Sequence, residues 1–245
     1  MTLVGWIETT IREYHRLHLY KDIELFYSRM GLFFFPTNFL YWENVSIHNE
    51  IKQTLMNKIT ELDDTFYKNQ ESKGLTNATT SFEVNIRDDI HKFMDGSVIN
   101  QLIWAPLERV LSNINPSVNF PTIELLDSVI SASWYTKYNT NGTFNLHNHY
   151  GDNVTIDNII YKPTFSIIYI LNDENEHNST QFRIPHGAPL STLHTQEFHY
   201  DTKDNKEIKE GTVLIFPASL YHEVLPVKIP GRVTIAFNVV SRFRG

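Results

Sequence analysis

Two histidines separated by one residue form the feature of this sequence best suited to chemistry. His147 and His149 flank Asn148 within residues 134–153, WYTKYNTNGTFNLHNHYGDN. Side chains at positions i and i+2 of a strand point to the same face, so both imidazoles could reach one metal ion if this segment is a strand. Imidazole suits zinc, copper, iron and nickel. The pair therefore predicts part of a metal site whose other ligands come from elsewhere in the chain.

A third imidazole and a cation follow far downstream. His222 comes shortly after the apolar run 212–216, and Arg232 begins the apolar segment 232–240. A guanidinium at the start of a buried strand is costly unless an anion accompanies it. A carboxylate that accepts two parallel hydrogen bonds would satisfy it. These residues predict a metal site with a carboxylate-binding site beside it.

The composition is that of a globular protein and limits the possible chemistry. The 245 residues are 41% hydrophobic and 20% charged, which predicts one large domain with a full core. The chain has no cysteine, so thiolate ligands and disulfides are excluded and His, Asp and Glu remain as metal ligands. A formal net charge of -7 argues against a nucleic-acid partner. No membrane span or signal peptide is recognisable, so we expect a cytoplasmic protein.

The hydrophobic pattern predicts helices in the first half of the chain. Helical spacing occurs over residues 3–18, from Ser46 to Leu62, and over 97–114, where Pro106 should kink or split the helix. A buried strand is expected within 31–41, where Pro36 marks a turn. An exposed loop is expected over 67–80 and a short strand over 81–85.

From residue 130 the pattern changes to short strands, which predict a jelly roll or barrel. Turn signals at Asn141-Gly142 and Pro230-Gly231 separate some of them. The connections 151–163 and 185–195 are long enough to be substrate-contacting loops. We therefore expect an α+β, mainly β, single domain over 1–245, with a mainly helical support region (1–125) and a β core (130–240). The predicted strands are 131–138, 144–150, 164–171, 180–184, 196–200, 212–216, 222–227 and 232–240.

Three segments of the β half resemble a known family. Residues 211–227, GTVLIFPASLYHEVLPV, and 231–239, GRVTIAFNV, resemble the C-terminal half of the Fe(II)- and 2-oxoglutarate-dependent dioxygenases, in the phage and bacterial branch related to prolyl hydroxylases. Residues 165–172, FSIIYILN, resemble the strand that follows the metal pair in that family. The resemblance covers roughly residues 130–240 and implies a double-stranded β-helix, the cupin-like form of the jelly roll.

The resemblance also implies roles for individual residues. In this family a distal histidine binds iron, and an arginine some ten residues later, with Ser or Thr two positions on, binds the far carboxylate of 2-oxoglutarate. His222, Arg232 and Thr234 match this pattern. Tyr138 and Tyr169 lie on strands that could face the cavity, where they would donate a hydrogen bond to the cosubstrate.

The sequence departs from the family at the first pair of ligands, where the usual pattern is His-X-Asp or His-X-Glu and His149 takes the place of the acid. Three interpretations remain open. His147, His149 and His222 hold the iron; or Asp152, with one of the first two histidines, restores a carboxylate ligand; or His149 is the first ligand and Gly151 leaves the acid's position open. Strand alternation favours the first.

The function implied by the resemblance is oxidation of an unidentified small-molecule or peptide substrate. Dioxygen and 2-oxoglutarate would be consumed, with release of succinate and carbon dioxide, and hydroxylation is the expected outcome. Two alternatives share the jelly roll. A cupin-type three-histidine metalloenzyme would bind metal without 2-oxoglutarate and would not need Arg232. A non-enzymatic jelly-roll binding module would bind no metal.

Overall fold

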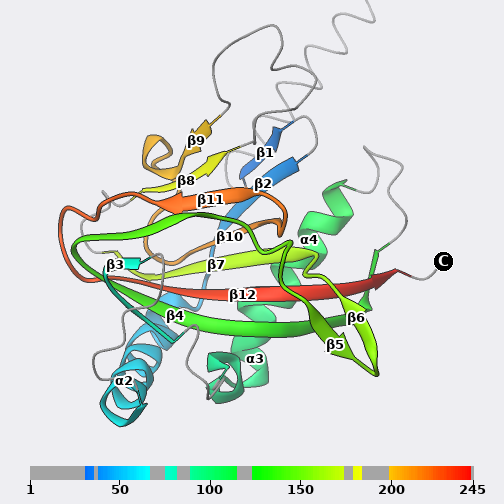
Figure 1. Ribbon diagram of the computed structural model, residues 1–245, viewed down its shortest axis with the longest axis horizontal. Helices are drawn as coiled ribbons and strands as arrows, with labels where there is room; N and C mark the ends of the chain where they lie inside the picture. The colour runs from blue at the N-terminus through cyan, green and yellow to red at the C-terminus, as the bar shows by residue number, and fades with distance from the viewer. Residues whose placement is uncertain are drawn as a thin grey trace, which may run out of the picture.

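A curled antiparallel sheet dominates the computed structural model of the protein (Figure 1). The structure describes residues 31–35, 38–66, 75–81, 89–114, 123–173, 179–183 and 199–243. The sheet has the order β1-β2-β10-β7-β12-β4-β11-β8-β9, with β3 paired to β4, so the predicted mainly β fold is confirmed. Its strands are β1 (Gly31–Phe35), β2 (Asn38–Asn44), β3 (Leu75–Thr80), β4 (Ile123–His147), β7 (Phe165–Asn172), β8 (Thr180–Arg183), β9 (His199–Asp201), β10 (Thr212–Pro217), β11 (Tyr221–Val224) and β12 (Arg232–Phe243).

The strand β4 belongs to both halves of the curled sheet. Its first part pairs with β12 as far as Tyr138, and its last part pairs with β11 at Phe144 and His147. Strands β2, β10, β7 and β12 lie on one side of β4, and β11, β8 and β9 lie on the other. The interior of the curl is therefore bounded by two walls that share one continuous strand.

The predicted turn at Asn141-Gly142 lies inside one strand, β4, which curls there from its pairing with β12 to its pairing with β11 (Figure 1). Asn141 has a φ of 63°. A side chain at Gly142 would place its Cβ only 2.8 Å from the backbone oxygens of Asn139 and Asn77. The backbone of Val227 bonds to both bend residues, at 2.7 Å from Asn141 and 3.0 Å from Gly142. An Asn-Gly pair is typical of a two-residue hairpin, whereas here these contacts with Val227 fix a bend within one long strand.

Helices cover one face of the sheet and form the main core with it. The helix α2 (His48–Phe66) buries Ile51, Leu55, Ile59 and Leu62, which recur at helical spacing as predicted. These side chains pack in one cluster with the odd-numbered residues of β7 and β12. Because side chains alternate along a strand, the even-numbered residues of both strands face the interior of the curl.

The helical segment before the β half contains the irregularity expected from Pro106. The helix α3 (Gly96–Ile99) continues through a π-helical segment, η2 (Asn100–Trp104), into α4 (Ala105–Ile114). Proline lacks an N–H and crowds the preceding turn, and a wider π turn relieves that conflict without ending the helix. Leu102, Ile103 and Leu107 from this segment are buried in the main core.

Several expectations change in the connecting segments. The predicted loop 67–80 ends in strand β3, and the connection 151–163 contains a hairpin of β5 (Val154–Ile156) and β6 (Ile159–Tyr161). The region expected to be helical support also supplies β1, β2 and β3. The helix predicted over 3–18, most of the strand over 81–85 and the connection 185–195 lie outside the described residues. Within the described ranges, no helix is both long and apolar enough to cross a membrane.

Candidate metal centre

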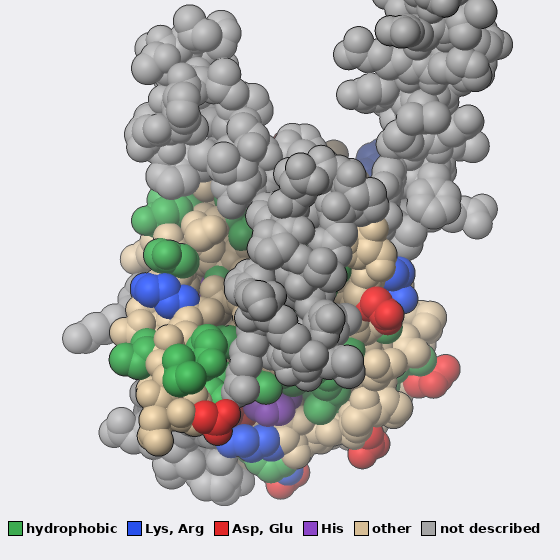
Figure 2. Space-filling model, turned by 90° about the vertical axis from the view of Figure 1, so that its right-hand side faces the viewer, with side chains coloured by type: hydrophobic (Ala, Val, Ile, Leu, Met, Phe, Trp, Pro, Cys, Tyr) green, Lys and Arg blue, Asp and Glu red, His purple; other side chains and the backbone are tan. Residues whose placement is uncertain are grey.

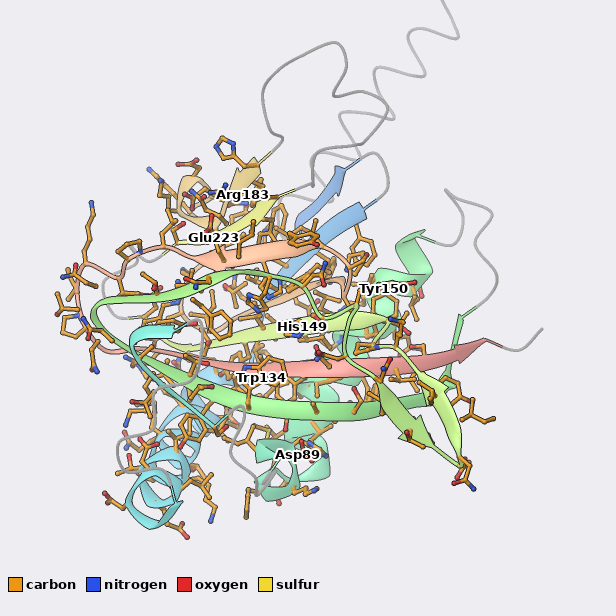
Figure 3. All side chains as sticks on the ribbon, in the orientation of Figure 1. Asp89, Trp134, His149, Tyr150, Arg183 and Glu223 are labelled. Carbon is orange, nitrogen blue, oxygen red and sulfur yellow. The ribbon has the colours of Figure 1, made fainter. Side chains whose placement is uncertain are left out.

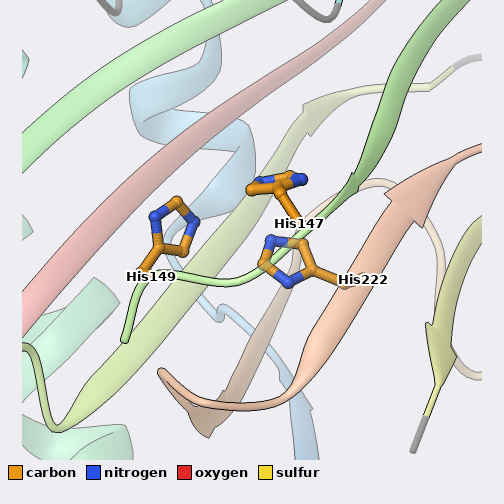
Figure 4. A group of neighbouring side chains, drawn as sticks. All are labelled: His147, His149 and His222. Carbon is orange, nitrogen blue, oxygen red and sulfur yellow. The ribbon is translucent and has the colours of Figure 1, made fainter. Parts of the chain in front are cut away.

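The structure brings three histidines together inside the curl. One ring nitrogen of each of His147, His149 and His222 lies within 4.8 Å of the others, and this is the metal-ligand cluster found among the described residues. The ring centroids of His147 and His222 are 4.2 Å apart. The His149 ring centroid lies 5.0 Å from that of His147 and 5.3 Å from that of His222. Figure 4 shows the three imidazoles facing a shared space.

A β-bulge directs His147 into this space. His147 lies opposite His222 across the β4 and β11 pair, and Phe144 lies opposite Val224. Between these two pairs β4 has one residue more than β11, so the alternation of side chains is reset. Phe144 and His147 consequently face the same cavity, with ring centroids 4.3 Å apart, although strict alternation would separate them.

His149 reaches the cluster from a turn and not from a strand. The strand β4 ends at His147, and the backbone N–H of Asp152 donates to the carbonyl of His149 at 3.1 Å. The backbone N–H of His149 donates to the Ala218 carbonyl at 2.8 Å, which anchors this turn to the end of β10. The predicted convergence of His147 and His149 is thus observed, but its cause is the bulge and the turn together.

In each of the three rings, Nδ1 lies within hydrogen-bonding distance of an acceptor oxygen. His147 Nδ1 lies 2.7 Å from the Asn145 carbonyl and His222 Nδ1 lies 3.1 Å from the Leu220 carbonyl. His149 Nδ1 lies 3.1 Å from the Asp152 carboxylate. Carbonyls and carboxylates only accept, so in a neutral ring the proton is on Nδ1 and the lone pair is on Nε2. Three fixed tautomers therefore offer Nε2 lone pairs to a metal ion.

Burial keeps two of these rings neutral. Burial, and then the neighbouring His149, lower the pKa of His147 to about 4. The pKa of His222 is lowered well below its usual value by burial and then by His147 and His149. A neutral imidazole is the form that binds metal, so these two ligands need no deprotonation near neutral pH.

The lowered pKa of His147 predicts an acid-dependent loss of stability in the metal-free protein. Between pH 6.5 and about pH 4 the unfolded chain binds a proton at His147 that the folded chain does not, so the free energy of unfolding falls as the pH falls through that window. The contribution of this half-buried ring is on the order of 2 kcal/mol. Denaturant unfolding in chelator should show a smaller pH slope for His147→Gln than for wild type. The exposed His199→Gln should retain the wild-type slope, and an equal slope in all three proteins would refute this origin.

Arg232 lies in the same cavity with part of its hydrogen-bonding capacity unused. It is 1% exposed and is the largest fully buried side chain among the described residues. Its Nη2 donates to Thr180 Oγ1 at 2.7 Å across the curl, from β12 to β8, whereas Nε and Nη1 have no hydrogen-bond partner in the described structure. A buried cation with two free donors is unfavourable unless a ligand accepts from them. This fits the carboxylate of a bound anion.

Tyr138 and Thr234 line the same cavity as Arg232. Tyr138 is the cross-strand partner of Arg232, whose guanidinium lies 5.8 Å from the phenol ring centroid. The side chains of Thr234 and Thr136 lie near the Tyr138 hydroxyl. Burial raises the pKa of Tyr138, so the phenol stays protonated and can donate.

Tyr169 lies outside the cavity, and its predicted contact with a cosubstrate is therefore wrong. Its hydroxyl is 2.7 Å from His48 Nδ1, on the face of β7 that packs against α2. The even-numbered neighbours Ser166 and Ile168 line the cavity instead. The strand was predicted correctly. Because both of its faces are buried, the sequence pattern does not indicate which face lines the cavity.

Other cavity residues carry no sequence signal that singles them out. Thr180 is one of many threonines, yet it bonds Arg232. Trp134 packs beside His149 with ring centroids 5.3 Å apart, and Figure 3 shows both residues within the curl. The cavity opens to solvent, and the space within it and at its mouth together is about 450 Å³. On the face shown in Figure 2, histidine surface is visible beside hydrophobic, acidic and basic side chains.

Comparison with protein families agrees with this geometry. Residues 132–238 match the family described as "Putative 2OG-Fe(II) oxygenase". The predicted resemblance to this family is confirmed over the matched segment, which is a little under half of the chain and contains every residue of the cavity described above. The family description names Fe(II) and 2-oxoglutarate, the two cofactors expected from the sequence. Comparison with curated proteins gives no significant match.

Solved structures share the fold at low sequence identity. OsALKBH1 is 15% identical, with a TM-score of 0.54 over 85% of this chain and 99% of that chain. The non-heme alpha ketoglutarate dependent epimerase SnoN from nogalamycin biosynthesis is 10% identical, with a TM-score of 0.53 over 89% and 83%. A Pseudomonas putida prolyl-4-hydroxylase is 14% identical, with a TM-score of 0.47 over 84% and 92%. The first two show the jelly-roll fold.

Proposed function

We propose that this protein is an Fe(II)- and 2-oxoglutarate-dependent oxygenase in which His147, His149 and His222 hold the iron. The family match over residues 132–238 supports the class of enzyme. The observation that carries the assignment to this site is the three-histidine cluster in one cavity with a buried, incompletely bonded Arg232. Asp152 lies on the Nδ1 side of the His149 ring, which favours the three-histidine set over Asp152 as a ligand.

Arg232 would bind the distal carboxylate of 2-oxoglutarate. Its free Nε and Nη1 atoms are donors, and a guanidinium binds a carboxylate through two parallel hydrogen bonds. Thr234 and the protonated phenol of Tyr138 lie beside it as further hydrogen-bonding groups. Thr180 holds Nη2 and thereby fixes the plane of the guanidinium.

The remaining residues would orient the reactants and exclude water. When bound, Fe(II) and 2-oxoglutarate supply an oxidation in which dioxygen converts 2-oxoglutarate to succinate and carbon dioxide and transfers one oxygen atom to the substrate. Phe144, Ile168 and Phe216 give the cavity apolar walls, which protect such a reaction from bulk water. We propose that the product is a hydroxylated small molecule or peptide.

The cupin-type alternative differs in its requirement for Arg232. A three-histidine metal site without 2-oxoglutarate leaves the two free donors of Arg232 unexplained. A non-enzymatic binding module leaves three converging Nε2 lone pairs unexplained. The oxygenase accounts for both observations with one pair of cofactors.

Anaerobic calorimetry with Mn(II)-loaded and metal-free protein tests the proposal. We expect 2-oxoglutarate to bind the metal-loaded protein and to bind the metal-free protein at least about 10-fold more weakly, because its keto group and adjacent carboxylate can chelate the ion. Glutarate has both carboxylates but no keto group, so its affinity should depend little on metal. Metal binding without any 2-oxoglutarate binding would favour the cupin-type enzyme, and absence of metal binding would favour the binding module.

A further inference from the structure

The carboxylate of Asp152 lies against the metal cluster without belonging to it. Its Oδ2 is 3.1 Å from His149 Nδ1, and the turn from His149 to Asp152 is closed by a backbone hydrogen bond. The His149 side chain is 5% exposed and that of Asp152 is 43% exposed. The carboxylate thus sits at the rim of the cavity, and the ring it bonds lies inside.

A second contact holds the same oxygen from the opposite wall. The Asn238 amide donates to Asp152 Oδ2 at 3.5 Å, a long hydrogen bond. Asn238 is 1% exposed, and its own amide oxygen accepts from Ser166 Oγ at 2.9 Å. A continuous chain of hydrogen bonds therefore runs from β7 and β12 to the His149 ring, through Ser166, Asn238 and Asp152.

His149 differs from the other two histidines in the nature of its acceptor. His147 and His222 bond backbone carbonyls two residues before them, so their orientation is set by the adjacent backbone. His149 lies beyond the end of β4 and depends on a side chain. A carboxylate is a stronger acceptor than a carbonyl and makes the opposite ring nitrogen a better metal ligand.

The lack of charge on the three ligands also indicates a role for the Asp152 carboxylate. The three ligand side chains are imidazoles, and the described residues place no carboxylate among them. A divalent cation bound there would receive no negative charge from its protein ligands. The carboxylate in contact with the cluster is that of Asp152, one imidazole away.

We propose that Asp152 is a positioning residue of the metal centre, which orients His149 through Nδ1 and supplies a negative charge to the bound ion from outside its coordination sphere. Asn238 and Ser166 hold that carboxylate in place. This role rests on the proposed metal site. It excludes direct ligation, because Oδ2 occupies the Nδ1 side of the ring and the ion would occupy the Nε2 side.

Binding of Co(II) by competition with a chelator tests this role in the full chain. We expect Asp152→Ala to bind Co(II) about 10- to 100-fold more weakly than wild type. Asp152→Asn keeps a neutral acceptor and should lie between them. Asp64→Asn removes an exposed acid from α2 and should bind Co(II) as wild type does. Metal-free melting temperatures should be alike in all four proteins, because Asp152 is at the surface of its turn.

The visible spectrum of bound Co(II) distinguishes positioning from ligation. A positioning residue leaves the number of ligands unchanged, so Asp152→Ala at saturating Co(II) should keep the wild-type band intensity with shifted band energies. An altered intensity, together with loss of affinity as large as in His222→Ala, would make Asp152 a ligand and overturn the proposal. Affinity within twofold of wild type in Asp152→Ala would also overturn it while leaving the oxygenase assignment intact. Equal Co(II) binding by wild type and His222→Ala would overturn both.

Discussion

Replacing Arg232 with methionine should weaken 2-oxoglutarate binding by at least about 100-fold, because the ligand carboxylate would lose a buried charged partner. Thermal stability without ligand should not fall. Arg232 is buried with Nε and Nη1 unbonded, and exchange of such a cation for an apolar side chain of similar length removes a desolvation cost. Loss of ligand binding in a protein that is equally or more stable would separate a binding role from a structural one.

Calorimetry and thermal shift measure this result together. In wild type, 2-oxoglutarate at 100 times its dissociation constant should stabilise the metal-loaded protein by roughly 2.7 kcal/mol, and Arg232→Met should show no such shift. Arg232→Lys keeps the charge but loses the planar fork, so it should bind with intermediate affinity. The exposed Lys206→Met, which also removes one positive charge, should bind as wild type does. Unchanged 2-oxoglutarate binding in Arg232→Met would remove the main support for the proposed function.

Replacing either His149 or His222 with alanine should eliminate metal binding at micromolar ion concentrations. Each ring supplies one of the three converging nitrogens, so two ligands would remain. The loss should exceed the roughly 10- to 100-fold that removal of an outer hydrogen-bond partner costs. His222 also packs against Phe182 and Phe216 in the interior, so its variant should lose some stability as well.

Metal titration monitored by calorimetry and by metal content after purification checks this second prediction. The exposed His199→Ala should bind metal as wild type does, and circular dichroism of each metal-free variant should confirm that it is folded. Comparison of His149→Ala with Asp152→Ala also tests which residues are metal ligands. If His149→Ala retained metal while Asp152→Ala lost it, the site would contain two histidines and a carboxylate.

The distal half of the site is predictable from the sequence because its residues lie on regular strands. Residues 212–216 and 232–240 are apolar runs with clear ends, and Arg232 and Thr234 keep the two-residue spacing that places them on one face of β12. A charged residue in such a strand is conspicuous because its burial needs an explanation. The structure places both residues in the cavity.

The proximal half is less predictable because irregular backbone decides it. The bulge before His147, the turn at His149 and the bend at Asn141 depend on contacts with β11, Ala218 and Val227, which are distant in the sequence. For Tyr169 the strand itself gives no signal, because both of its faces are buried. Local patterns predict elements, whereas tertiary contacts decide which side chains the elements present.

The bulge in β4 also determines where the chain can change in length. Tyr138 beside the anion site and His147 at the metal cluster are nine positions apart on one strand, and the extra residue between Phe144 and His147 makes both face inward. Loss or gain of one residue there would turn His147 out of the cavity, since each step reverses the side-chain direction. The tip of the β5 and β6 hairpin at Asp157 and Asn158 has no such constraint. Insertions and deletions should therefore be tolerated at the hairpin tip and selected against between 139 and 146, even where single substitutions are harmless.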